Sequence, residues 1–240
     1  MTRRAALGHL CWPEVAGRSV TLLVPLGATE QHGPHLPLDT DSRVATTVAE
    51  QVAQRFADAA DDRAVLVAPT LSYGASGEHE GFPGTVSLGH EALHLMLIEY
   101  GRSACRWADR LVFVNGHGGN GSTLVSAVRR LRYEARDVAW FPCADPHGDA
   151  HAGHTETSVL LHISPDDVVF SAAQVGNTAP IATLLPTMRE GGVSAVSDNG
   201  VLGDPRSATV DYGAALAEAL VTGLADAVDA WSVGETGRLG

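Results

Sequence analysis

The sequence contains no lysine, few aromatic residues and only three cysteines, and each shortage excludes a class of protein. All 16 basic residues are arginine, whereas Asp and Glu number 28, which leaves a formal net charge of −12. A chain this acidic argues against nucleic acid or an anionic membrane surface as a partner. Without lysine the chain also lacks a residue that a Walker-type nucleotide site requires.

The three cysteines, Cys11, Cys105 and Cys143, form an odd set with no CxxC spacing. Neither a disulfide framework nor a thiolate zinc site is therefore expected. We predict that the three cysteines are buried, act as small hydrophobic residues and stay reduced in the cytosol. No stretch approaches the roughly 18 apolar residues of a membrane helix, and the N-terminal segment lacks the apolar run of a signal peptide. We therefore expect a cytoplasmic protein with no membrane partner.

Enough apolar residues are present for a full core, at 45% of 240 residues, and we expect a single domain over residues 1–240. Short β-branched runs alternate with segments of helical periodicity, which indicates an α/β three-layer sandwich with a mostly parallel central sheet. Residues 178–205 are the least regular part. We predict strands at residues 19–26, 64–68, 110–115 and 138–141, and helices at 39–58, 89–107, 122–136, 155–163 and 207–231.

Histidines and carboxylates follow the ends of all four predicted strands. The segment after the first predicted strand contains Glu30, His32 and Asp41, and the Gly-rich segment after the second contains Glu78 and His79. His117 follows the third strand, and His151 and Glu156 follow the fourth. In a parallel sheet such segments lie side by side at the carboxyl edge, where ligands bind. Imidazole and carboxylate together are ligands for Zn, Mn or Fe(II), so the pattern indicates a metal site.

Several alternatives remain open at this point. The glycines around His117 could cradle a phosphate, although neither GxGxxG nor GxxxxGK[ST] is present. No GxSxG elbow occurs, and no cysteine has an adjacent histidine, which disfavours serine and thiol nucleophiles. A catalytically silent binding domain with a structural ion is the remaining non-enzymatic interpretation.

A set of short motifs resembles the creatininase (creatinine amidohydrolase) family. They are Glu30-Gln-His-Gly33, Asp41, Ser76-x-Glu-His79, Phe82-Pro-Gly-Thr85, Asn115-Gly-His-Gly-Gly-Asn120 and His151-Ala-Gly-x-x-Glu-Thr-Ser158. The motifs occur in the family's order over residues 20–160. The run Asp149–Ser158, with Asn177–Pro180 and Asn199–Pro205, is similar to one branch, the creatininase-type peptidases of the mycofactocin system.

The resemblance implies which residues form the site. Glu30, Asp41 and His117 would hold one divalent ion, and His32, Asp41 and Glu156 the other, with Asp41 shared. Creatininase takes its second carboxylate from the position that is Gly119 here, and Glu156 is the replacement. His151 would polarise the carbonyl or protonate the leaving nitrogen, and Glu78 is the other candidate for proton transfer. The same resemblance makes Ser76, His79 and Asn120 the expected substrate-binding residues.

The resemblance also implies the activity, cofactors and partners. Two divalent ions per chain (Zn, Fe(II) or Mn) would serve an enzyme that removes the C-terminal Val-Tyr dipeptide from the modified mycofactocin precursor peptide. A homo-oligomer, a hexamer or larger, is expected. The alternative is hydrolysis of a small cyclic amide or a formamide by the same site.

Overall fold

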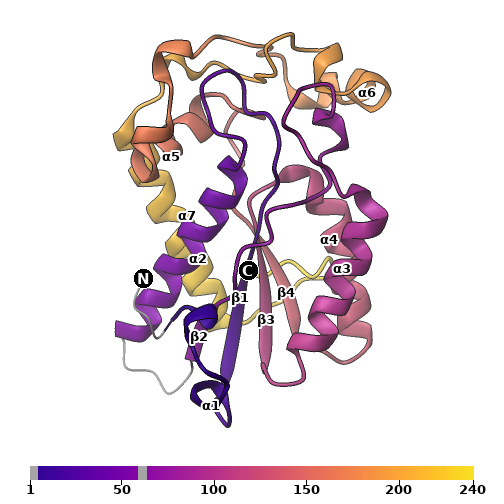
Figure 1. The fold of residues 1–240 in the computed structure, drawn as a ribbon, viewed down its shortest axis with the longest axis vertical. Coiled ribbons are helices and arrows are strands. Elements are labelled where there is room, and N and C mark those ends of the chain that lie inside the picture. Colours follow the sequence, from indigo (N-terminus) through magenta and orange to yellow (C-terminus); the bar gives the residue numbers. More distant parts are fainter. Residues whose placement is uncertain (1–4, 59–63) are drawn as a thin grey trace.

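A computed structural model describes residues 5–58 and 64–240 (Figure 1). A four-stranded sheet with strand order β2-β1-β3-β4 forms the centre, and all three strand pairs are parallel. Its strands are β1 (Val20–Leu26), β2 (Ala64–Val67), β3 (Arg110–Asn115) and β4 (Val138–Pro142). The helices of the described residues are α1 (Trp12–Val15), α2 (Thr40–Asp58), α3 (Gly89–Ala104), α4 (Gly121–Tyr133), α5 (His154–Ile163), α6 (Ile181–Gly191) and α7 (Val210–Ala230).

Helices cover both faces of the sheet, as the alternation of side chains along a strand requires. In β3, Leu111 and Phe113 belong to the apolar cluster under α3 and α4, whereas Val112 and Val114 belong to the cluster under α2, α5 and α7. Phe113 has no exposed surface, and burial of such a side chain stabilises the fold by about 1.5–3 kcal/mol. The predicted α/β three-layer sandwich with a mostly parallel sheet is confirmed.

The predicted elements all occur, with ends shifted by a few residues, but two helices were missed, the short α1 and α6. α6 lies within residues 178–205, which the sequence indicated as irregular, and Pro186 lies inside it. Proline removes a helical hydrogen bond and is unusual inside a helix. The single domain over residues 1–240 stays a prediction. None of the helices in residues 5–58 and 64–240 has the length and apolar character that crossing a membrane requires.

The cysteine prediction is correct for only one residue. Cys143 is buried, Cys105 is half-buried and Cys11 is exposed. Cys11 immediately precedes the short helix α1, where its main-chain N–H donates to Glu14 Oε2 at 2.7 Å. Its position is therefore set by the end of a surface helix rather than by packing.

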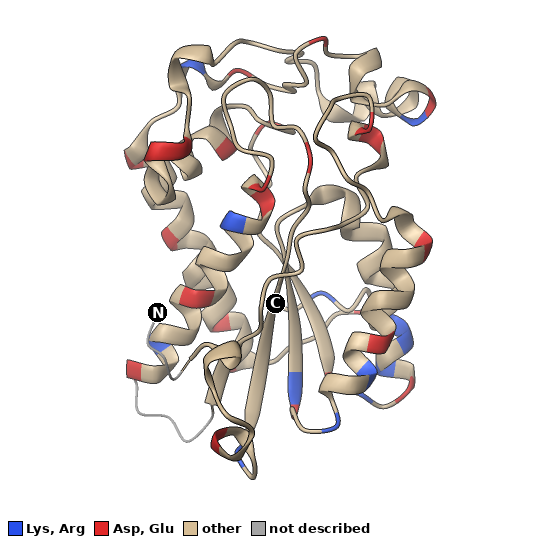
Figure 2. Ribbon diagram, in the orientation of Figure 1, with Lys and Arg blue, Asp and Glu red and all other residues tan. Residues whose placement is uncertain are grey.

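Charge is distributed unevenly between the two ends of the sheet. Arginines gather at the amino-terminal edge, around the start of β3 and the ends of α3 and α4, whereas carboxylates occur in the segments at the carboxyl edge (Figure 2). Glu134 accepts from three of these arginines, with Arg102 Nη2 at 2.5 Å, Arg130 Nε at 2.8 Å and Arg136 Nη1 at 2.6 Å. At the carboxyl edge Arg43 pairs with Asp39 and Asp167, whereas the ion pairs of Glu30 and Asp41 among the described residues are with histidines, which makes their surroundings suited to cations.

Candidate active site

The five expected metal ligands come from the segments that follow the strands and lie together. Glu30 and His32 follow β1, Asp41 lies in the first turn of α2, His117 follows β3, and Glu156 lies in the first turn of α5. The first four are buried, and 27% of the Glu156 side chain is exposed.

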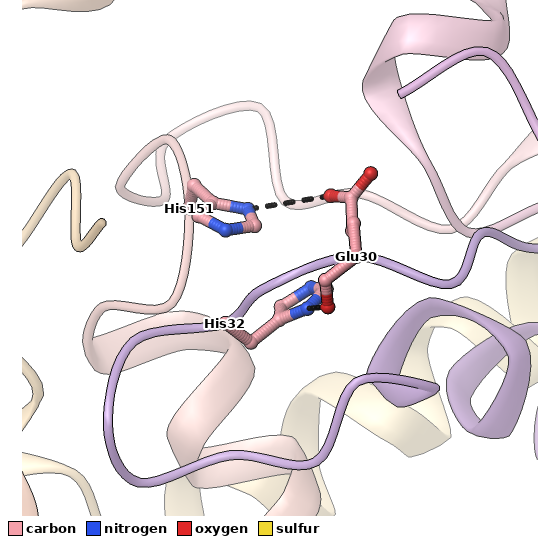
Figure 3. Close-up of side chains that lie close together, drawn as sticks. All are labelled: Glu30, His32 and His151. Carbon is pink, nitrogen blue, oxygen red and sulfur yellow. Dashed lines mark hydrogen bonds and ion pairs between the residues drawn. The ribbon is translucent and has the colours of Figure 1, made fainter. Parts of the chain in front are cut away.

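Two groups of three side chains each place their ligand atoms within 4.8 Å of one another. One comprises Glu30, Asp41 and His117, and the other comprises His32, Asp41 and Glu156. These are the two sets that the resemblance implied, and Asp41 belongs to both. A third group, Glu30, His32 and His151, satisfies the same distance, and Figure 3 shows the imidazole of His151 directed at the Glu30 carboxylate. The metal-ligand roles themselves stay predictions.

Main-chain carbonyls decide which nitrogen of each histidine faces the cluster. A carbonyl can only accept, so the ring nitrogen beside it must carry the proton. His117 Nε2 lies 3.0 Å from Ala75 O, His32 Nδ1 lies 3.1 Å from Glu30 O, and His151 Nε2 lies 2.8 Å from Gln31 O. In the neutral rings the other nitrogen keeps its lone pair. A metal-binding histidine is oriented by the same kind of bond.

Those lone pairs are aimed at carboxylates. His117 Nδ1 lies 3.2 Å from Glu30 Oε1 and 3.3 Å from Asp41 Oδ2, and His32 Nε2 lies 3.1 Å from Asp41 Oδ1. Within the described residues, both Glu30 carboxylate oxygens and Asp41 Oδ2 are buried without a hydrogen-bond partner. A buried carboxylate that lacks donors costs several kcal/mol unless a cation compensates it. The residues present therefore fit divalent ions.

The pKa values in this cluster show that its carboxylates strongly stabilise positive charge. Burial lowers the pKa of His32, but the charge and hydrogen bond of Asp41 outweigh burial, and the pKa rises to about 10. Burial likewise opposes protonation of His117, yet Glu30 and Asp41 hold its pKa well above the usual value. Burial raises the pKa of Glu156 to about 7. Without a metal ion, His32, His117 and Glu156 therefore bind protons that compensate the negative charge of the cluster.

His151 differs from the other two histidines. Burial, followed by the neighbouring His32 and His79, lowers its pKa well below the usual value, so its ring is neutral. Its Nδ1 lies 3.8 Å from Glu30 Oε1 and 4.0 Å from Glu156 Oε2. A neutral ring with a free lone pair at the edge of the cluster can accept a proton, as a catalytic base requires. The catalytic role expected for His151 stays a prediction.

Glu78 and Ser76 approach the cluster from the side of His117. Glu78 Oε1 lies 3.7 Å from His117 Nε2, and 28% of its side chain is exposed, so it connects the buried groups with solvent. Ser76 Oγ lies 3.5 Å from the same nitrogen and is buried. The proton-transfer role of Glu78 and the substrate-binding role of Ser76 stay predictions.

Both polar atoms of the Asn120 side chain form hydrogen bonds within the protein. Its Oδ1 accepts from Ala75 N at 2.9 Å, and its Nδ2 donates to Gly27 O and Asn115 Oδ1, both at 3.1 Å. It thus joins the loops after β1 and β2 to the start of α4. The expected substrate contact of Asn120 stays a prediction, and these bonds give it a structural task that spacing did not indicate.

Gly119 occupies a position with no room for a side chain. A Cβ at this position would lie 2.3 Å from His117 Nε2 and 2.6 Å from both Ala75 O and Glu78 Oε1. Any side chain here would displace the histidine or the carbonyl that orients it. The site leaves no room for a carboxylate at residue 119, whereas Glu156 Oε2 reaches to 3.9 Å from His32 Nε2 and accepts from Ala152 N.

Comparisons with known proteins agree in sequence and in fold. A family model described as creatinine amidohydrolase matches residues 8–228. The chain is 56% identical over 240 residues to a mycofactocin precursor peptide peptidase of Mycolicibacterium smegmatis, covering 96% of this chain and 97% of that protein.

Two solved structures resemble it over nearly their whole length. A mutant creatininase of the Zn-Zn type has a TM-score of 0.79 at 30% identity, covering 95% of this chain and 98% of that one. A creatininase described with Mn has a TM-score of 0.79 at 30% identity and covers 94% of this chain and 98% of its own. The similarity therefore includes the segments that carry the site.

Proposed function

The chain belongs to the creatininase family, and from this premise we propose that it is a metal-dependent peptidase of mycofactocin biosynthesis. It would remove the C-terminal Val-Tyr dipeptide from the modified mycofactocin precursor peptide. The 56% identical mycofactocin precursor peptide peptidase of Mycolicibacterium smegmatis supports a peptide substrate, because the similarity extends over nearly the whole length of both chains.

One observation carries the hydrolytic chemistry: Asp41 is shared by two ligand sets that each contain a histidine with its lone pair facing inward. We propose that these sets hold two divalent ions per chain, and Zn, Mn and Fe(II) all suit such ligands. When bound, the ions would activate a water molecule and polarise the scissile carbonyl. The Zn-Zn and Mn forms of the similar creatininases support this cofactor.

Side chains of the protein would transfer the protons during amide hydrolysis. His151, with Nε2–H held by Gln31 O, presents Nδ1 to the cluster and would accept a proton during attack on the amide. His151 would then return this proton to the leaving nitrogen, and Glu78, partly exposed beside His117, is the alternative group for the proton transfer. Ser76 and His79 line the same side and would contact the substrate.

A pocket of about 650 Å³ adjoins Glu78 and offers the room that a peptide needs. The loop around Glu78 forms one wall, and Leu185, Met188 and Arg189 of α6 form the other. Ligand pockets typically enclose about 300–1,000 Å³, so this volume suits peptide side chains better than a creatinine-sized molecule alone. The pocket is large enough for part of a peptide, and Glu78 is the site residue that it shares with the expected proton-transfer groups.

We propose further that the enzyme is cytoplasmic, acts as a homo-oligomer of six or more chains, and has neither nucleic acid nor membrane as a partner. The acidic charge of −12 supports the last two points. Exposed apolar side chains at Val169, Phe170 and Val175 support contacts between copies.

The decisive experiment incubates metal-loaded enzyme with the modified precursor peptide and follows release of the Val-Tyr dipeptide by mass spectrometry. We expect release by the native chain and none by Glu30→Gln, which keeps the shape of the side chain but removes its charge. A parallel panel contains creatinine and formamides. Turnover of creatinine without turnover of the peptide would establish the alternative activity instead.

A further inference from the structure

Gln31, which lies between two expected metal ligands, has a side chain whose orientation is forced by the main chain. Gly33 N, which can only donate, lies 2.8 Å from Gln31 Oε1, and Gly200 O, which can only accept, lies 3.1 Å from Nε2. The amide oxygen and nitrogen are therefore assigned without ambiguity. Gly200 has a φ of +78°, and a Cβ there would lie 2.0 Å from Gln31 Oε1, so the position admits only glycine.

The fixed amide determines the proton position on His79. Gln31 Nε2 lies 2.8 Å from His79 Nδ1, and because an amide nitrogen donates, Nδ1 must accept. The ring proton then lies on Nε2, which is 3.3 Å from Glu30 Oε1. His79 thus presents an N–H to the site.

The same residue imposes the opposite arrangement on His151. The main-chain carbonyl of Gln31 accepts from His151 Nε2 at 2.8 Å. Gln31 Nε2 also lies 3.1 Å from that ring nitrogen, but its two N–H groups are used by His79 Nδ1 and Gly200 O, so the His151 proton stays on Nε2 and its Nδ1 lone pair faces the site. The rings of His79 and His151 lie side by side, with centroids 4.4 Å apart and planes tilted by 44°. Two adjacent imidazoles therefore face one carboxylate with opposite polarity, one as donor and one as acceptor.

We propose that Gln31 is a positioning residue that fixes these opposite polarities, with its side chain acting on His79 and its main chain on His151. The donor N–H of His79 then steadies the Glu30 carboxylate or a substrate oxygen, while His151 remains free to take a proton. Without the amide, His79 can rotate or shift its proton to Nδ1 and offer a lone pair to Glu30, which repels it. The consequence for turnover rests on the proposed hydrolase function, whereas the proton positions do not.

The first test needs no substitution. Solid-state ¹⁵N NMR of the metal-loaded protein labelled at histidine distinguishes protonated from unprotonated ring nitrogens, and His79→Asn identifies the signals of that ring. We expect His79 to carry its proton on Nε2, with Nδ1 unprotonated. A proton on Nδ1 of His79 in the native protein would overturn the proposal, whatever the enzyme hydrolyses.

The second test uses two substitutions that keep the length of the side chain. Gln31→Met removes the amide, and Gln31→Glu replaces the donor with an acceptor, which should move the His79 proton to Nδ1. For both variants we expect kcat for the modified peptide to fall about 10- to 100-fold with KM changed less than about threefold, the range for groups that orient site residues. Metal content, measured by mass spectrometry, should be that of the native chain.

Gln51→Met, an exposed position on α2, is the matched control and should retain native turnover. Loss of turnover in the Gln31 variants with the His79 signals unchanged would also overturn the proposal, because the effect would then act by another route. Failure of the native enzyme to cleave the peptide would contradict the proposed function alone and leave the NMR result decisive.

Discussion

The Nε2–H of His117 donates to the main-chain carbonyl of Ala75 at 3.0 Å. Because a carbonyl only accepts, this bond directs the lone pair of Nδ1 to Glu30 Oε1 and Asp41 Oδ2. Ala75 is held in turn by Asn120, whose Oδ1 accepts from Ala75 N at 2.9 Å. A chain of two hydrogen bonds thus connects a fully buried asparagine with the orientation of an expected metal ligand.

Asn120→Ala should therefore weaken both the fold and the site. The substitution leaves Ala75 N–H and Gly27 O buried without their partner, at a cost of about 1–3 kcal/mol for each group. Chemical denaturation should show the loss in the free energy of unfolding, and metal affinity should fall about 10- to 100-fold. Ser126→Ala, an exposed change on α4, is the control. Native metal affinity in Asn120→Ala would contradict the connection.

Asp41→Asn should affect both expected ions at once. Asp41 Oδ1 faces His32 and Oδ2 faces His117, so the loss of its charge removes a ligand from each set. We expect less than one ion per chain by elemental mass spectrometry, and turnover reduced by about 100-fold or more, beyond the range for orienting groups. Asp39→Asn, at a half-exposed carboxylate paired with Arg43, should keep the native metal content. A native content in Asp41→Asn would contradict the shared role.

Metal binding should release protons. In the metal-free protein the pKa of His32 is raised to about 10, so the ring is protonated at pH 7.5 and must lose a proton before Nε2 can bind an ion. Apparent affinity should therefore rise about tenfold per pH unit for each displaced proton. Calorimetric titration with Zn in buffers of different ionisation enthalpy counts the protons. Zero release at pH 7.5 would contradict the raised pKa.

The same shift predicts how the metal-free protein responds to alkali. The folded pKa of His32 lies above the ordinary value of 6.5, so its contribution to stability is complete below about pH 6.5 and is lost as the pH rises through about 10. Thermal unfolding of the metal-free protein should accordingly occur at lower temperature at pH 9.5 than at pH 7. The protein loaded with metal should show a smaller change, because the ion replaces the proton.

The sequence predicted those parts of the fold that depend on local pattern. β1, β2 and β3 are short apolar runs that are buried on both faces, as with Leu111 and Phe113 on one side of β3 and Val112 and Val114 on the other, whereas β4 is only partly buried. Such runs are typical of parallel strands. α6 lies in the part of the sequence with the least regular pattern, and its helix is supported by packing of Leu184 with Val193 and Leu202.

The expected ligands could be predicted because the segments after neighbouring parallel strands meet at one edge. The groups that orient them could not. Gln31 contacts His151 and Gly200, which lie 120 and 169 residues away along the chain. Ala75 contributes only a carbonyl, which every residue possesses, so its side chain carried no signal. Orientation of the site thus depends on long-range contacts that spacing does not encode.

The buried thiol of Cys143 and the exposed thiol of Cys11 should react at very different rates. Burial raises the pKa of Cys143 to about 12, which leaves almost no thiolate at pH 8, whereas Cys11 is exposed. A thiol-specific disulfide reagent should therefore label Cys11 rapidly and Cys143 only after unfolding. Cys11→Ser should remove the fast phase. Rapid labelling of Cys143 in the folded protein would show that the region between β4 and α7 opens.

His151→Ala separates a catalytic base from a metal ligand. His151 Nδ1 lies 3.8 Å from Glu30 Oε1, and the residue belongs to a third possible ligand group with Glu30 and His32. If it moves protons, the variant should keep two ions per chain while kcat falls about 10²- to 10⁴-fold, the contribution of a positioned acid or base. If it binds metal, one ion should disappear together with activity.

We expect the first outcome, because two complete sets of three ligands form without His151 and Asp41 already joins them. His147→Ala, in the same segment before α5 but outside these sets, is the matched control and should keep both metal and turnover. Elemental analysis of the same preparations used for the kinetics keeps the two readouts comparable. Loss of one ion from His151→Ala would move this residue from the proton-transfer step to the metal site.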